Sequence, residues 1–446
     1  MSRFLFTIWP YPGHLHPAIA IARAVRARGH EVAFYTGASA RRMIEGEGFS
    51  LFPFRKLDEQ RVTDIVTREF PYIPSLLARV KNSRRTGAKF REWLLDTVPQ
   101  QVDDITEVLA VWSPDVLVPD MAFWGPILVL HEARPIPVAV LSVAIACALP
   151  GPEVPVWGFG WPPPRNAMMR FRYRLSRSLG KRLAAAFREQ TNLVRSPYGL
   201  PPLSCSPTEH AGRMPLYLMP SIREYDYNRQ DLAANVHYVG PCLWDNPEKQ
   251  PPPPWLNQLP PDQPLIYVTD ATIGTSEPFL LKAAALAFQN QRVQVVMTTG
   301  KQRNPADLGL CDLPRNIRVE AYVPQSDLLP KTSVMVTVGG SGGVLAALKD
   351  GVPLVVSPTE WDRQENAQRV VEAGAGIRIP AERCTPQRLR AAVEQVLRTP
   401  SYRNNARRLA AACARYPGPS QAAELLEKLA CTATGERNLQ KGVALA

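Results

Sequence analysis

Two regions of the chain repeat the same order of apolar strand, turn and amphipathic helix. In the first, the apolar run Phe4–Trp9 leads into a turn at residues 10–13, a helical apolar face that begins near Pro17, and a second strand at Val32–Tyr35. The second half repeats this order at Leu265–Thr269, Pro278–Phe288 and Val293–Thr298. Each region is a βαβ unit, so the pattern predicts an α/β protein with two doubly wound parallel-sheet domains.

A proline-rich stretch separates the two predicted domains. Residues 245–255 read DNPEKQPPPPW, and four prolines in a row cannot continue a helix or a central strand. We therefore predict a first domain over 1–240, a linker over 241–256 and a second domain over 257–418. A last helix at Gln421–Leu429 and a flexible tail are expected within 419–446.

A glycine-rich turn follows one of the apolar strands of the second half. The strand ends at Val338, residues 339–343 read GGSGG, and a helix-like run extends over Val344–Lys349 before a further strand around Leu354–Val356. The unpaired N–H groups and the positive dipole end of a helix N-terminus attract anions, and glycine lets a ligand approach the backbone. The turn therefore predicts a phosphate site.

Composition narrows the class of protein. With 446 residues, of which 45% are hydrophobic and 21% charged, the chain is expected to be globular, and it has no apolar run long enough to cross a membrane. The N-terminal apolar stretch is short and broken by prolines, as in a first buried strand rather than a signal peptide. Seven dispersed cysteines indicate reduced thiols in a cytoplasmic protein, with no metal-ligand spacing.

The net charge of +12 comes largely from two Arg-rich segments, Arg79–Arg91 and Arg165–Arg188. Solvated helix faces are the simpler interpretation, and peripheral contact with an anionic membrane surface is the alternative. No nucleic-acid recognition motif accompanies the charge, so a nucleic-acid partner is not expected.

Several ordered motifs surround the glycine turn: Tyr322-Val-Pro-Gln325 before it, then Gly351-Val-Pro353, Pro358, and Asp362 with Asn366-Ala367 after it. In this order and spacing they resemble the inverting nucleotide-sugar glycosyltransferases with two facing Rossmann-like domains, the GT-B fold. That family includes plant UDP-glycosyltransferases and bacterial antibiotic, macrolide and sterol glycosyltransferases. The resemblance covers nearly the whole chain and is strongest over 320–380.

The resemblance implies roles for residues of the second domain toward the donor. Tyr322 would stack on the nucleobase, the Val323 backbone would pair with the base edge, and Gln325 would help to hold the nucleoside. Asp362 would accept hydrogen bonds from sugar hydroxyls. The diphosphate would lie against the turn and near the domain's first loop, at Val338, Gly339, Gly340, Ser341, Gly342 and Thr275.

The resemblance also implies a catalytic pair in the first domain. His14 lies in the sequence Gly13-His-Leu-His-Pro17, on a predicted loop at the carboxyl edge of the sheet, where it aligns with the family's general base. Asp120, which ends the strand Val116–Val118, would orient the imidazole and stabilise its charged form. His16 is an alternative base.

Three positions depart from the family pattern. Val338 replaces a histidine that hydrogen-bonds the donor phosphate, Arg363 replaces a glutamine that contacts the sugar, and Ala346 replaces a ribose-binding glutamate of plant members. Arg363 would either replace the lost hydrogen-bond donor near the diphosphate, face an unusual sugar, or point outward. UDP- and dTDP-sugars both remain open as donors.

These residues predict a glycosyltransferase of the hexosyl type that acts on a hydroxyl of a hydrophobic small molecule, without a metal or a bound cofactor. A catalytically weak nucleotide-sugar-binding homologue that assists another enzyme is the alternative. A sugar-nucleotide epimerase and a nicotinamide dehydrogenase fit the motifs less well. The oligomeric state is not indicated. Aromatic residues near predicted loop ends are expected to line the acceptor cleft: Trp9, Phe123, Trp124, Trp157, Phe159 and Trp161.

Overall fold

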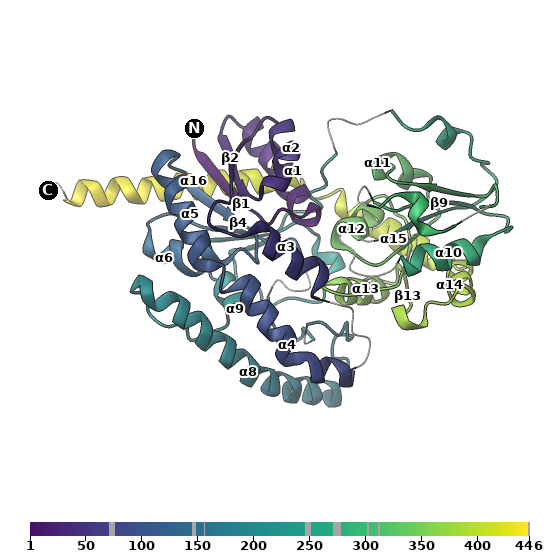
Figure 1. The fold of residues 1–446 in the computed structure, drawn as a ribbon, viewed down its shortest axis with the longest axis horizontal. Coiled ribbons are helices and arrows are strands. Elements are labelled where there is room, and N and C mark those ends of the chain that lie inside the picture. Colours follow the sequence, from purple (N-terminus) through teal and green to yellow (C-terminus); the bar gives the residue numbers. More distant parts are fainter. Residues whose placement is uncertain are drawn as a thin grey trace.

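Two α/β units lie side by side in the computed structural model, the first drawn in purple to teal and the second in green in Figure 1. Each is built on a parallel sheet, so the predicted fold class is confirmed. The residues that the structure describes are 1–70, 76–144, 149–155, 157–245, 251–270, 278–300, 303–310 and 313–444.

The first unit has the strand order β3-β2-β1-β4, with bounds Ser50–Pro53, Glu31–Thr36, Arg3–Thr7 and Val116–Pro119. Single parallel bridges from Leu117 to Val138 and from Asp120 to Leu141 continue it into β5-β6-β7. Those three strands span Ala139–Leu141, Leu216–Met219 and Val236–Tyr238. Central parallel strands are covered on both faces, which explains why β1 and β4 are almost unbroken apolar runs.

The helix that follows β1 begins earlier than predicted. Helix α1 spans Pro12–Ala27, so His14 lies in its first turn rather than on a loop, and Pro17 lies inside the helix. Pro12 suits the first helical position because its fixed φ is helical and its missing N–H has no partner there. The other α-helices of this unit are α2 Arg41–Gly46, α3 Glu59–Arg68, α4 Leu76–Leu94, α5 Val98–Val111, α6 His131–Ala133, α8 Ala167–Arg195 and α9 Pro207–Ala211.

The second unit has the strand order β10-β9-β8-β11-β12-β13. In that order the strands span Ile317–Glu320, Gln294–Thr298, Leu265–Thr269, Val334–Thr337, Leu354–Val356 and Gly376–Arg378. The predicted linker 241–256 lies between Tyr238, the end of β7, and the start of β8. The α-helices of this unit are α10 Phe279–Phe288, α11 Gln325–Leu328, α12 Ser341–Lys349, α13 Arg363–Glu372, α14 Pro386–Arg398 and α15 Pro400–Cys413.

The last helix, α16, returns to the first unit. It spans Pro419–Ala444, well beyond the predicted Gln421–Leu429, and it continues where a flexible tail was expected. Ala422, Leu426 and Ala430 recur every four residues and are buried in the same core as α1, β1 and β2. Figure 1 shows the yellow helix alongside these elements. Within the described ranges, we find no helix with the length and apolarity needed to cross a bilayer.

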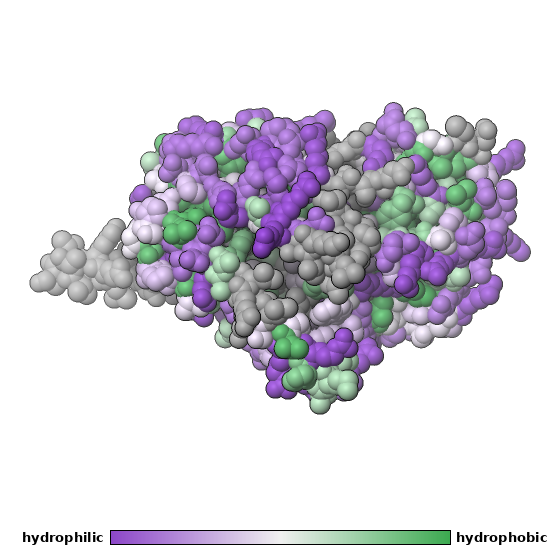
Figure 2. All heavy atoms as spheres, turned by 60° about the horizontal axis from the view of Figure 1, so that its bottom comes forward, coloured by the Kyte–Doolittle hydropathy of each residue, from purple (hydrophilic) through white to green (hydrophobic). Residues whose placement is uncertain are grey.

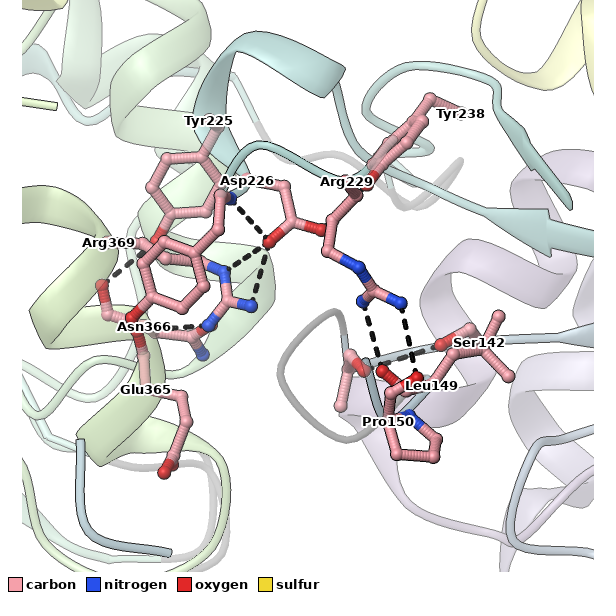
Figure 3. A network of polar contacts seen from close by, with 12 residues as sticks. Ser142, Leu149, Pro150, Tyr225, Asp226, Arg229, Tyr238, Glu365, Asn366 and Arg369 are labelled. Atoms are coloured by element: carbon pink, nitrogen blue, oxygen red, sulfur yellow. Dashed lines mark hydrogen bonds and ion pairs between the residues drawn. The ribbon is translucent and has the colours of Figure 1, made fainter. Parts of the chain in front are cut away.

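A buried polar network joins the two units (Figure 3). Arg369 of α13 donates from Nε and Nη2 to Asp226 Oδ1 of the first unit, both at 2.8 Å, and each side chain is only 1% exposed. Asp226 also accepts from Tyr238 Oη at 2.6 Å. The Tyr225 hydroxyl donates across the same boundary to the Asn366 carbonyl at 3.1 Å. Helix α13 is therefore fixed to the first unit by charge and hydrogen bonds.

Candidate active site

One cleft of about 2270 Å³ receives the carboxyl ends of strands from both sheets. Residues that follow the ends of six strands line the cleft. They are His14 after β1, Met121 after β4, Asp270 after β8, Tyr322 after β10, Ser341 after β11 and Asp362 after β12. Ligands of open parallel sheets bind at this edge, so the two sheets present their binding edges to the same space.

His14 and Asp120 form a hydrogen-bonded pair on the first unit's side of the cleft. His14 Nδ1 lies 2.5 Å from Asp120 Oδ2, and the Ala122 N–H donates to Asp120 Oδ1 at 2.7 Å. A carboxylate accepts hydrogen bonds, so in the neutral imidazole Nδ1 carries the proton that it donates to Asp120, and Nε2 keeps its lone pair. The imidazole is 23% exposed and lines the cleft, whereas Asp120 is fully buried. The arrangement leaves Nε2 as the proton acceptor.

The environment of His14 sets its protonation. Burial disfavours the imidazolium, but the Asp120 charge, its hydrogen bond and the nearby Asp362 charge outweigh burial and raise the pKa of His14 above its usual value. Asp362 belongs to the second unit, so its influence places the two halves of the site within electrostatic reach of each other.

The glycine turn forms the N-terminus of α12 on the opposite wall. Gly340 is the N-cap residue, and the nine-residue helix begins at Ser341. Gly339 has φ +92°, and a Cβ there would come within 2.8 Å of Val356 Cγ1, so only glycine fits the turn. An added Cβ at Gly340 or Gly342 would meet nothing within 4 Å, which leaves their backbone open to a ligand. The first N–H groups of the helix have no intrahelical acceptor and suit a diphosphate.

Asn366 ties the glycine turn to Asp362. Its Nδ2 donates to the Gly339 carbonyl at 3.0 Å and to Asp362 Oδ2 at 2.9 Å, and it lies 3.0 Å from Ser341 Oγ. Ser341 Oγ in turn donates to Asp362 Oδ2 at 2.6 Å. Asn366 is 1% exposed, so its amide is a buried brace between the N-termini of α12 and α13.

We expect Asn366→Ala to weaken donor use more than acceptor use. The change removes the brace, because the Gly339 carbonyl loses the amide donor and Asp362 keeps only the Ser341 hydroxyl, so the predicted diphosphate and sugar contacts lose their alignment. The KM for the donor should rise about tenfold, while the KM for the acceptor changes less than about twofold. Equal changes in both constants would contradict the role. Asn405→Ala is the control, because its amide caps the Gly374 carbonyl outside the cleft.

The predicted nucleoside contacts lie together on the wall formed by β10 and α11. Tyr322 is 49% exposed and lines the cleft, and Val323 is buried beside it. Gln325 also lines the cleft, and its Nε2 donates to the Tyr267 hydroxyl at 3.4 Å. Their roles in binding stay predictions. Thr275 lies outside the described residues.

Two of the positions that depart from the family pattern, Val338 and Arg363, have different surroundings. Val338 is buried, lines the cleft and has no donor atom on its side chain. Arg363 is 7% exposed and donates to Thr359 Oγ1 at 2.5 Å and to Glu360 Oε1 at 2.6 Å. Its guanidinium is thus already engaged by a carboxylate, and its contact with the diphosphate stays a prediction.

The aromatic residues predicted to line the acceptor cleft divide into two groups. Trp124 and Trp157 do line it, and Trp157 is 38% exposed. For Trp9 and Phe123 the expectation is wrong, because both are fully buried in the core, with ring centroids 4.7 Å apart. Phe159 and Trp161 are not among the residues that line the cleft; their rings stack on each other at 4.8 Å, beside α8.

Other aromatic residues line the cleft without having been predicted. Trp361 lies between β12 and α13, takes φ +64° and packs against Phe70 and Trp93 of the first unit at 4.9 and 5.7 Å. Phe90 lines the cleft with Trp93 and Trp361. A positive φ is uncommon for a bulky residue, and here it directs the indole across the boundary between the units. In the sequence, the position of Trp361 directly before the predicted sugar-binding residue Asp362 could have indicated that it lines the cleft.

The loop that carries Trp157 is attached to the second unit. The N–H groups of Gly158 and Gly160 donate to Glu365 Oε1 of α13 at 2.6 and 3.0 Å. Arg378 Nη1 donates to the Gly160 carbonyl at 2.5 Å. Burial raises the pKa of Glu365. The wall of the cleft that contains Trp157 is therefore positioned by the helix that begins next to Asp362.

Comparisons with known proteins agree with this geometry. Residues 289–429 match the family model for the C-terminal domain of erythromycin biosynthesis protein CIII-like proteins. The chain is 33% identical over 435 residues to the 4'-demethylrebeccamycin synthase of Lentzea aerocolonigenes, covering 96% of this chain and 99% of that protein. It is 26% identical over 440 residues to the demethyllactenocin mycarosyltransferase of Streptomyces fradiae, covering 96% and 87%.

Solved structures share the fold. The glycosyltransferase of kitacinnamycin aligns with a TM-score of 0.71 at 22% identity, over 96% of this chain and 99% of the other. The glycosyltransferase VinC in complex with dTDP aligns with a TM-score of 0.67 at 20% identity, again over 96% and 99%. With a relative of 33% identity along its whole length, the chain belongs to the natural-product glycosyltransferase family of the GT-B fold.

Proposed function

We propose that this protein transfers a hexose-type sugar from a UDP- or dTDP-sugar to a hydroxyl of a hydrophobic natural-product aglycone. The observation that supports the proposal most directly is the shared cleft. The His14–Asp120 pair lies on one wall, and the α12 N-terminus with Asp362 lies on the other. A base and an anion site that face each other suit a displacement in which one reactant loses a proton and the other loses a diphosphate.

In the proposed reaction, His14 Nε2 takes the proton of the acceptor hydroxyl as its oxygen attacks the anomeric carbon. The new carbon–oxygen bond forms as the bond from that carbon to the diphosphate breaks, and the electron pair leaves with the nucleoside diphosphate. Attack from the face opposite the leaving group inverts the anomeric configuration. Asp120 stabilises the imidazolium, and the N–H groups that start α12 stabilise the departing charge.

The acceptor side of the cleft favours an extended apolar molecule with aromatic surface. Trp93, Trp124, Trp157 and Phe90 line it, and Trp361 is contributed by the second unit. The volume of about 2270 Å³ exceeds the roughly 300–1,000 Å³ of common small-molecule sites, as expected for a cleft that holds both a nucleotide sugar and an aglycone.

Val338 supports one alternative, a nucleotide-sugar-binding homologue that assists another enzyme. Its side chain offers the donor phosphate no hydrogen bond. The buried Asp120 paired to His14 favours catalysis instead, because a binding protein has no need of an oriented base. Both functions predict nucleotide binding, and only the enzyme predicts turnover.

We expect UDP or dTDP, and their sugars, to raise the melting temperature of the protein. A ligand at about 100 times its Kd stabilises the native state by about 2.7 kcal/mol, which is a shift of several degrees in a thermal melt. The nucleotides that bind are then tested as sugar donors with a panel of hydrophobic aglycones, product being detected by mass spectrometry. Binding without turnover would support the auxiliary function, and no binding of either nucleotide would contradict both.

A further inference from the structure

Helix α8 presents an apolar stripe to solvent. Met168, Phe171 and Leu175 are 73%, 63% and 64% exposed, and their spacing places them on one face of the helix. Figure 1 places α8 along the lower edge of the molecule, and Figure 2, which brings this side forward, shows green side chains among purple ones there. Three large apolar side chains side by side on the surface indicate a contact surface rather than scattered exposure.

The stripe faces away from the protein because the other side of the helix is anchored. Tyr173 is buried, its hydroxyl donates to the Pro162 carbonyl at 2.7 Å, and its ring stacks on Trp161 with centroids 5.7 Å apart. Tyr173 lies nearly opposite the stripe on a helical projection. The helix is therefore held in the orientation that exposes Met168, Phe171 and Leu175.

The charges around the stripe have one sign. Residues 165–188 contain eight lysines and arginines and no aspartate or glutamate. Arg172 and Arg174 flank the stripe on its two sides. Among the described basic residues, Arg165 pairs with Glu372 and Arg170 lies 3.8 Å from Glu153 near the start of the helix, and Arg195 pairs with Glu132 at its far end. An apolar stripe bordered by arginines suits the interface of an anionic bilayer, where apolar side chains enter and guanidinium groups meet the headgroups.

We propose that α8 docks the protein on an anionic lipid surface. The orientation has a consequence for the reaction, because Arg174, Phe187 and Arg188 of the same helix also line the acceptor cleft. Docking through the stripe brings the cleft wall to the bilayer, so a hydrophobic acceptor dissolved in lipid reaches the site without crossing water. This consequence rests on the proposed function; the docking itself does not.

Sedimentation with phospholipid vesicles tests the docking. The protein should bind vesicles of phosphatidylcholine and phosphatidylglycerol at low salt, and bind pure phosphatidylcholine vesicles much more weakly. The triple variant Met168→Ser, Phe171→Ser, Leu175→Ser should lose at least about tenfold in affinity for the anionic vesicles. The pair Arg172→Gln, Arg174→Gln should weaken binding and flatten its dependence on salt.

Leu286→Ser is the matched control, since Leu286 is 58% exposed on α10, away from α8. It should bind vesicles like the unchanged protein. Circular dichroism and the thermal shift with UDP or dTDP show whether each variant folds. Absence of binding to anionic vesicles, or equal loss in the Leu286 control, would overturn the proposal. Vesicle binding needs no turnover, so a failed transfer assay and a failed docking assay are separate results.

Discussion

Replacement of His14 by alanine is expected to lower kcat by about 10²–10⁴-fold and to leave nucleotide binding unchanged. A neutral hydroxyl is a poor nucleophile, and in the cleft His14 is the imidazole whose Nδ1 is held by a buried carboxylate. Nucleotide binding is predicted to involve the opposite wall, at Tyr322 and the α12 N-terminus, which the change does not touch. Transfer rates and thermal shifts on the same preparation separate the two effects.

The pH dependence of the rate gives a second measurement of the same residue. His14 acts only when neutral, so kcat/KM rises with pH and levels off above the pKa of His14, which the Asp120 and Asp362 charges raise above the usual value of about 6.5. Asp120→Asn removes one of these charges and lowers the pKa of His14, so the rise should move to lower pH while the plateau falls. A profile that does not move would contradict the pairing.

His16 provides the matched control for His14. It lies two residues along the same helix, lines the cleft and has its ring 4.9 Å from that of Trp244. Because the Asp120 carboxylate is hydrogen-bonded to His14, we expect His14 to be the base and His16→Ala to retain most of the activity. Loss of transfer in His16→Ala together with retention in His14→Ala would assign the base to His16 instead.

The parallel sheets could be predicted from the sequence because buried strands leave a strong local signal. β8 and β12 occur at the predicted residues, since both are short apolar runs bounded by polar or turn residues. The glycine turn was predictable for a related reason. The positive φ of Gly339 and its contact with Val356 require a residue without a Cβ, so the constraint is visible in the sequence itself.

Features set by contacts between distant segments could not be predicted. An aromatic residue near a strand end is equally consistent with a core and with a cleft, and Trp9 and Trp157 differ only in what the rest of the fold places over them. The position of Trp361 depends on Phe70 and Trp93 of the other unit. The length of α16 depends on its packing against the first unit, which local helix propensity does not reveal.

Arg369→Met is expected to destabilise the protein by about 3–5 kcal/mol, the largest stability effect that we predict. The variant leaves the Asp226 carboxylate buried at the boundary between the units without its counter-charge. Tyr238 and the Tyr227 N–H still donate to it, at 2.6 and 2.8 Å, but hydrogen bonds alone do not neutralise a charge that is 1% exposed. Urea denaturation followed by fluorescence measures the loss.

Arg415→Met is the matched control for this prediction. Arg415 pairs with Glu224, which lies two residues before Asp226 in the chain. Because the Arg415 side chain is 63% exposed, its loss should change stability by less than about 1 kcal/mol. Adding Asp226→Asn to Arg369→Met should restore part of the stability, because an amide is less costly to bury than an unpaired carboxylate. The ring centroid of Tyr227 lies 4.1 Å from the guanidinium carbon of Arg369. Additive losses in the double variant would show that Arg369 stabilises the boundary by this cation–π contact and not by its ion pair with Asp226.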